Sequence, residues 1–111
     1  MIILNVTSLT SPLDIGAFLS GQNYDLGQVG NNEIKVIANS TGGAISVILP
    51  PTSINPEQNM TVLVADESGT AGTHNITISG GNIDGATTNV ISTNYAAVKL
   101  EILTSGDWVV V

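Results

Sequence analysis

Apolar and polar residues alternate in short runs along most of this 111-residue chain. The clearest runs are Asn75-Ile76-Thr77-Ile78-Ser79 and Ala97-Val98-Lys99-Leu100-Glu101-Ile102. A period of two places every second side chain on the same face of a β-strand. The pattern predicts strands at roughly 2–7, 23–26, 33–38, 44–49, 60–65, 75–79, 89–92, 97–103 and 107–111.

Residues that favour turns separate these runs. Gly80-Gly81-Asn82 and Ser105-Gly106-Asp107 supply residues that tolerate positive φ, and Pro50-Pro51 cannot donate to a strand ladder. Short strands at this spacing are typical of a small β-sandwich, a jelly roll or a barrel. The sequence therefore predicts an all-β fold of roughly eight to nine short strands, in one domain over residues 1–111.

One stretch, from Ser11 to Leu19, has the signals of a short helix. Ser11 would be its N-cap, Pro12 its first residue and Asp14 part of its first turn. A loop that carries the apolar residues of this stretch into the core is the alternative.

Two predicted strands, 44–49 and 60–65, carry apolar residues on both faces. A strand with one solvated face does not have this pattern. The second face is covered either by the other sheet with a loop or by another copy of the chain. We expect self-association.

Composition excludes several classes of protein. The net charge is −7, and Lys35 and Lys99 are the only basic residues, so the surface repels a phosphate backbone and nucleic acid is not an expected partner. Without cysteine there is no disulfide framework and no thiolate metal site. No run approaches the roughly 18 apolar residues of a membrane-spanning segment, so no membrane partner is expected.

The sequence offers little catalytic chemistry. His74, the single histidine, lies in a predicted loop without a nucleophile motif, which favours a solvated loop histidine. Asp66-Glu67-Ser68-Gly69 resembles an acidic calcium loop but lacks the EF-hand spacing, so an acidic turn is favoured over a nonspecific calcium site. We predict no enzyme, no cofactor and no metal site.

The aromatic residues allow two interpretations. Tyr95 and Trp108, with Tyr24 and Phe18, could form a platform on which sugars stack. Trp108 is followed by Val109, Val110 and Val111, which favours core or subunit packing for its ring. Lys99 and Glu101, on one face of a predicted strand, are interpreted as ordinary sheet decoration.

A series of short motifs in the last two thirds of the chain resembles a β-module of bacteriophage virion proteins, found in fibre and spike domains. In order, they are Leu49-Pro50, Asp66-Glu67-Ser68-Gly69, Asn75-Ile76-Thr77-Ile78, Ile83-Asp84-Gly85, Tyr95-Ala96-Ala97-Val98-Lys99-Leu100 and Gly106-Asp107-Trp108. The resemblance implies a non-enzymatic structural protein, a homotrimer, on the outer surface of the virion.

The chain has no long repetitive shaft, which shifts this expectation toward a capsid decoration (cement) protein, a head spike or a small fibre subunit. We expect it to bind the major capsid protein or another virion protein through exposed strand edges and an attachment segment at 1–21. Ile2, Leu4 and Phe18 are candidate subunit or capsid contacts. The alternative is a receptor- or glycan-binding fibre tip that uses Tyr95 and Trp108, and an enzyme that uses His74 is a distant third.

Overall fold

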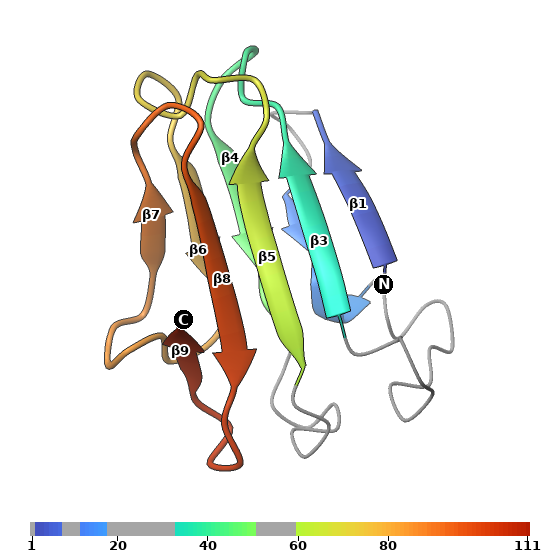
Figure 1. Ribbon diagram of the computed structural model, residues 1–111, viewed down its shortest axis with the longest axis vertical. Coiled ribbons are helices and arrows are strands. Elements are labelled where there is room, and N and C mark those ends of the chain that lie inside the picture. The colour runs from blue at the N-terminus through green and yellow to red at the C-terminus, as the bar shows by residue number, and fades with distance from the viewer. Residues whose placement is uncertain (1, 8–11, 18–32, 51–59) are drawn as a thin grey trace.

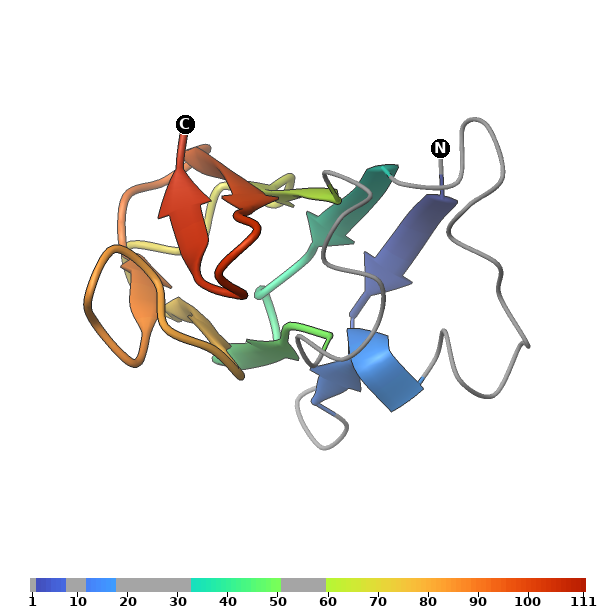
Figure 2. The same cartoon turned by 90° about the horizontal axis from the view of Figure 1, so that it is seen from below.

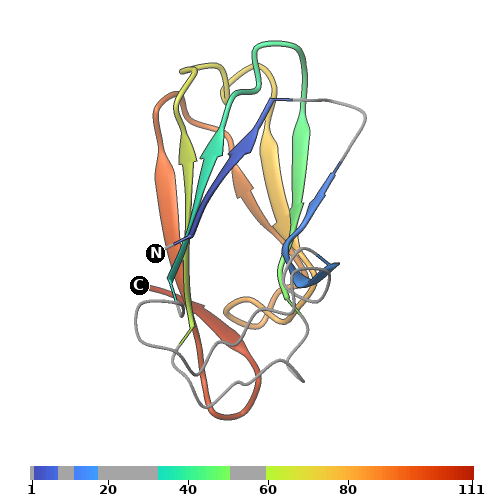
Figure 3. The same cartoon turned by 90° about the vertical axis from the view of Figure 1, so that its right-hand side faces the viewer.

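The computed structural model describes residues 2–7, 12–17, 33–50 and 60–111, which form two β-sheets packed face to face (Figure 3). The larger sheet has the strand order β1 (Ile2–Val6), β3 (Glu33–Ala38), β5 (Thr61–Asp66), β8 (Ala97–Ile102) and β9 (Trp108–Val110) (Figure 1). The smaller sheet has the order β2 (Leu13–Asp14), β4 (Ile45–Ile48), β6 (Ile76–Ser79) and β7 (Asn89–Ile91).

The chain alternates between the two sheets from β1 to β6, so neighbouring strands in this part run parallel: β1, β3 and β5 in one sheet, and β2, β4 and β6 in the other. Parallel strands need a long crossover, and here a strand of the opposite sheet supplies it. The later pairings, β6 with β7, β5 with β8 and β8 with β9, are antiparallel. Both sheets are therefore mixed, and β1 and β9 end the larger sheet on opposite sides (Figure 2).

The core lies between the sheets and consists of every second residue of the central strands. In β3 and β5 the inward residues are paired in register, with Ile34 beside Val62 and Val36 beside Val64. They face the smaller sheet, whose inward residues are equally buried: Ile45, Val47, Ile76 and Ile78. Burial of such side chains stabilises the fold by about 1.5–3 kcal/mol each, before entropy is counted.

The predicted all-β fold is confirmed, and of the architectures left open by the sequence it is sandwich-like, since over the described residues neither sheet closes into a barrel. The strand predicted at 33–38 matches β3, and the other predicted strands that lie in the described ranges agree with observed strands to within one residue at either end. The strand predicted at 23–26 lies outside the described residues.

The prediction of a helix with Pro12 as its first residue and Asp14 in its first turn is wrong, and its predicted N-cap, Ser11, lies outside the described residues. Leu13 and Asp14 form β2, which pairs with Val47 and Ile48 of β4, and the helical turn begins after them at Ile15. Asp14 Oδ1 accepts a hydrogen bond from the N–H of Ala17 at 3.0 Å, so Asp14 is the N-cap. Because Leu13 and Asp14 pair with β4, the chain stays extended up to Asp14, and the helical turn starts only after this residue.

Two glycines with positive φ test how tightly the sheet ends are packed. A Cβ on Gly80 (φ 99°) would lie 2.9 Å from the backbone N of Leu49, whereas nothing lies within 4 Å of a Cβ on Gly85 (φ 84°). Gly85→Ala should lower the free energy of unfolding by about 1–2 kcal/mol through backbone strain alone. Gly80→Ala should cost about 1–3 kcal/mol more, because the clash is with backbone. Urea unfolding measures both variants, and equal losses would contradict this packing.

Candidate functional site

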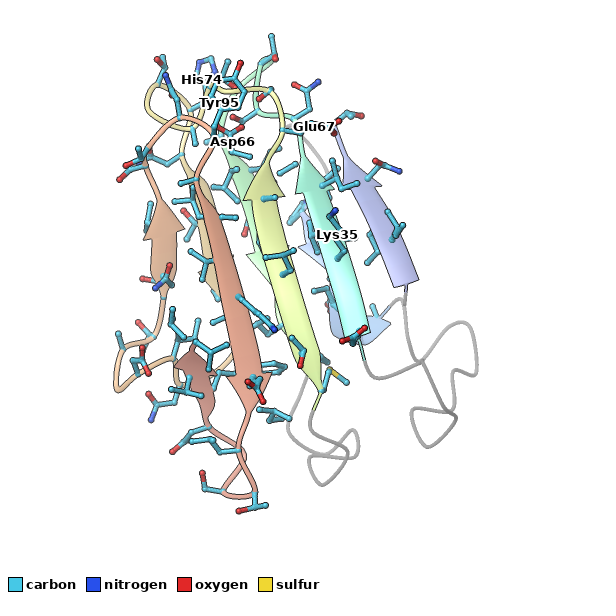
Figure 4. All side chains as sticks on the ribbon, in the orientation of Figure 1. Lys35, Asp66, Glu67, His74 and Tyr95 are labelled. Atoms are coloured by element: carbon cyan, nitrogen blue, oxygen red, sulfur yellow. The ribbon has the colours of Figure 1, made fainter. Side chains whose placement is uncertain are left out.

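A buried carboxylate ties together the loops at one end of the sandwich. Asp66, the last residue of β5, is 3% exposed. Its Oδ1 accepts hydrogen bonds from the Ser68 hydroxyl at 3.0 Å and the N–H of Gly69 at 3.1 Å. Its Oδ2 accepts from the N–H groups of Ala71 and Tyr95, both at 3.0 Å. One side chain therefore holds the turn after β5 and the turn before β8 (Figure 4).

Three hydroxyl groups extend this cluster toward the turn after β3. Thr70 Oγ1 lies 2.6 Å from Ser68 Oγ and 2.7 Å from Ser40 Oγ. His74 Nδ1 donates to the carbonyl oxygen of Ser40 at 2.8 Å. A nucleophilic hydroxyl needs a base within hydrogen-bond reach, but this histidine nitrogen bonds to backbone and four donors occupy the Asp66 carboxylate. We interpret the cluster as a structural clamp.

The electrostatics of Asp66 follow from these bonds. Burial raises the pKa of its carboxyl, but hydrogen bonds favour the charged form and together hold the pKa below its ordinary value of 3.8. The groups that lower the pKa include the backbone N–H groups of Tyr95 and Ala71, the hydroxyl of Ser68 and the N–H of Thr70. The carboxylate is therefore charged and fully occupied at neutral pH.

The same contacts weigh against calcium at the acidic turn, since the Asp66 oxygens face hydrogen-bond donors rather than an open site. In the described part of the chain, no three His, Cys, Asp or Glu side chains are grouped to hold a metal ion. None of the helical residues described forms a segment long and apolar enough to cross a membrane.

The two candidate aromatic residues lie at opposite ends of β8 and do not form a joint platform. Trp108 is 1% exposed, packs in the core beside Gly81, and its Nε1 has no acceptor among the described residues. Tyr95 is 74% exposed, has a positive φ of 63°, and its ring lies against Gly69. Of these two, Tyr95 alone is available to a ligand, and the other candidate aromatics, Tyr24 and Phe18, lie outside the described residues.

The candidate contacts in the N-terminal segment are placed differently from one another. Leu4 is 9% exposed and belongs to the core. Ile2 begins β1 and its backbone pairs with Ile34. Phe18 lies outside the described residues. Among the described side chains of β1, the exposed apolar one is instead Ile3, at 56%.

The outer face of the larger sheet brings the two lysines together. The strand register aligns Ile3, Lys35, Leu63 and Lys99 across β1, β3, β5 and β8, and we call this the lysine row. The next row on the same face, the glutamate row, contains Glu33, Thr61, Glu101 and Val109. Figure 4 shows Lys35 midway along β3 on this face.

This face is apolar between its charges. Leu63 is half-buried between the two lysines, and Val111, whose N–H donates to the carbonyl oxygen of Lys99, is 59% exposed. Neither lysine forms an ion pair within the described structure. A hollow of about 170 Å³ spans the two rows and is lined by Glu33, Ile34, Lys35, Thr61, Leu63 and Lys99. The outer face of the larger sheet is therefore the candidate interaction surface.

Sequence reasoning missed this surface because the lysines are far apart along the chain. The signal was present as two Glu/Lys pairs with a spacing of two, Glu33 with Lys35 and Lys99 with Glu101. The pair Lys99 and Glu101 was interpreted as ordinary sheet decoration. The sequence alone does not show that β5 lies between β3 and β8 and so brings the two pairs onto one face.

Replacing Asp66 tests the clamp. Asp66→Asn keeps the shape but turns an NH₂ group toward buried donors, and it should lower the free energy of unfolding at pH 7 by about 3 kcal/mol. Because the folded pKa is depressed, the carboxylate's contribution is complete above pH 3.8 and is lost as pH falls through the folded pKa. The difference in the free energy of unfolding between wild type and Asp66→Asn, here called the gap, should therefore close in strong acid.

Urea unfolding between pH 2 and 7 measures this gap, with the exposed neighbour Glu67→Gln as control. The control should stay within about 0.5 kcal/mol of wild type throughout. A gap that does not depend on pH would contradict a clamp made by the charged form.

Comparison of the sequence with protein-family models and with curated proteins found no match to either.

Proposed function

We propose that this chain is a non-enzymatic structural protein of a bacteriophage particle, a capsid decoration (cement) protein or a head spike or fibre subunit that assembles as an oligomer on the outer surface. The order of motifs in its last two thirds supports the virion assignment. The partner is the major capsid protein or another virion protein. The observation that carries this proposal is the position of the two N-terminal strands.

Among the strands that the structure describes, both N-terminal strands are edge strands. β1 is outermost in the larger sheet and β2 outermost in the smaller sheet. The two edges lie on the same side of the sandwich, as Figure 2 shows. Edge strands present backbone N–H and C=O groups that can pair with another chain. The segment expected to attach the protein thus supplies both of these edges.

The direction of the backbone groups of β1 can be derived from one hydrogen bond. The carbonyl oxygen of Val6 accepts from the N–H of Asn39 at 2.9 Å, so Val6 faces the β3 side. Backbone groups of successive residues in a strand point to opposite sides. Ile3 and Asn5 therefore direct their N–H and C=O groups to the side of β1 away from β3, which is the free edge of the sheet over the described residues. A strand added there gains main-chain hydrogen bonds without needing charged side chains.

Asn5→Pro tests attachment through this edge. Proline removes the outward N–H of Asn5 and is tolerated in an edge strand when the lost donor faces away from the sheet. The variant should fold but reach less than about a tenth of wild-type occupancy on particles. A loss of this size is expected when one main-chain hydrogen bond to the added strand is missing and the strand register is disturbed. Asn5→Ala, which keeps the N–H, should attach like wild type.

Occupancy is measured by quantitative mass spectrometry on particles purified from a strain that carries the coding sequence, with circular dichroism of each purified variant as the folding control. Absence of the wild-type chain from the particles would overturn the virion assignment. Equal occupancy of the proline variant would overturn edge attachment.

A glycan-binding fibre tip is the second candidate, because Tyr95 presents an exposed ring on a turn that Asp66 holds in place. Aromatic faces stack on the apolar faces of sugars. A glycan array measures binding by wild type, Tyr95→Phe and Tyr95→Ala. Binding by the first two proteins and loss of binding in Tyr95→Ala would favour this candidate.

A further inference from the structure

The charges on the outer face of the larger sheet are self-complementary. On both β3 and β8, a glutamate and a lysine lie two residues apart on this face, Glu33 with Lys35 and Glu101 with Lys99. The register puts both glutamates in one row and both lysines in the next. Between them, β5 carries Thr61 in the glutamate row and the larger Leu63 in the lysine row.

The spacing of these groups follows from strand geometry. Residues two apart on a strand are separated by roughly 7 Å, and the two charged strands, with β5 between them, lie roughly 10 Å apart. The four charges thus form a rectangle with anions along one long side and cations along the other. A half-turn about an axis in the face, running across the strands between the two rows, exchanges the two sides.

We propose that a second copy of this chain binds face to face over these two rows, related by that two-fold axis. The operation keeps each strand over its equivalent and reverses its direction. Lys35 then lies over Glu33 of the second copy, Lys99 over Glu101 and Leu63 over Thr61. Every charge in the rectangle meets an opposite charge, and each contact occurs twice, as in any isologous interface.

The net charge of the chain makes this face the favoured place for self-contact. Two copies each of charge −7 repel one another over most of their surfaces, and both basic residues of the chain lie on this one face. Shape supports the same arrangement, because the hollow of about 170 Å³ lies beside Thr61 where Leu63 of the second copy would enter. Half-buried Leu63 would then lose its remaining contact with water.

The size of the patch sets the expected strength. Three strands and two to three rows amount to about 200–300 Å² per copy, below the roughly 800 Å² of a standard interface. The dimer should therefore be weak, with a Kd on the order of 100 μM. Display of many copies on one particle would raise the local concentration and hence the occupancy of such a contact. In this respect the inference rests on the proposed function.

Charge exchange across the face tests the proposal. One variant, Lys35→Glu with Lys99→Glu, has an acidic face, and another, Glu33→Lys with Glu101→Lys, has a basic face. Each alone should remain a monomer of 11.4 kDa, because every opposed pair becomes like-charged. An equimolar mixture should form a heterodimer at least as strong as the wild-type dimer, since all pairs are again opposite in sign.

Sedimentation equilibrium up to about 1 mM measures these masses, a range chosen to bracket the expected Kd. The control is Glu67→Lys with Asp107→Lys, which makes the same change in net charge on exposed residues outside both rows. If net charge governed association, this control and the basic-face variant would behave alike. Of these two variants, the proposal requires that the basic-face variant lose the dimer and that the control keep it.

Three results would overturn the proposal: wild type monomeric throughout, an oligomer that both charge-reversed variants retain, or a mixture that fails to associate. Raising NaCl from 0.1 to 1 M should weaken the wild-type dimer about tenfold, since the screening length falls from about 10 to 3 Å.

These measurements use purified protein, whereas the proposed function is tested by occupancy on particles. Failure of one is therefore distinguishable from failure of the other. The contact is two-fold, and the trimer expected from the resemblance stays a separate prediction that these masses also test.

Discussion

The parallel pairing of β3 with β5 is the constraint on which the rest of the structure depends. It sets Val36 beside Val64 on the inner face and Lys35 beside Leu63 on the outer face. Because side chains alternate along a strand, a slip of one residue would move the core set to solvent and the charged set into the core. The interior and the candidate interaction surface are therefore fixed by the same register. Burial of the apolar set holds that register in place.

The ends of the sandwich depend on a different kind of interaction. After β5 the chain leaves the ladder, and the Asp66 carboxylate accepts the N–H groups of two separate turns, one of them at Tyr95. Leaving a buried N–H donor without an acceptor destabilises a protein by more than a typical hydrogen bond stabilises it. The Asp66 carboxylate is therefore important for the stability of both turns. Although it sits among serine, threonine and histidine side chains, its environment is that of a structural group rather than of a reacting one.

Two surfaces of the described residues carry the edge-attachment and face-pairing proposals, and they differ in what they offer a partner. The free edge of β1 offers backbone groups, which are independent of sequence in the partner and suit attachment to a larger assembly. The outer face of the larger sheet offers a pattern of charges and one apolar side chain, Leu63, which suits recognition of a specific face. Edge attachment and face pairing use different atoms, so one copy can do both at once.

The sequence by itself determined the strands, because alternation, β-branched residues and Gly or Pro turns are local signals that act within a few residues. It predicted β3 over 33–38 and an all-β fold, but left open whether this was a sandwich, a jelly roll or a barrel. It missed β2, since a two-residue strand such as Leu13–Asp14 has no period of its own and exists only because β4 pairs with it. The role of Asp66 was likewise beyond local reasoning, because Tyr95 reaches it from another turn.

Only the tertiary structure decided that Tyr95 is exposed and that Lys35 and Lys99 share a row, whereas the sequence already favoured core or subunit packing for Trp108. The physical reason is that burial and cross-strand register depend on which strands become neighbours. That order arises from packing between the sheets, and no spacing along the chain encodes it.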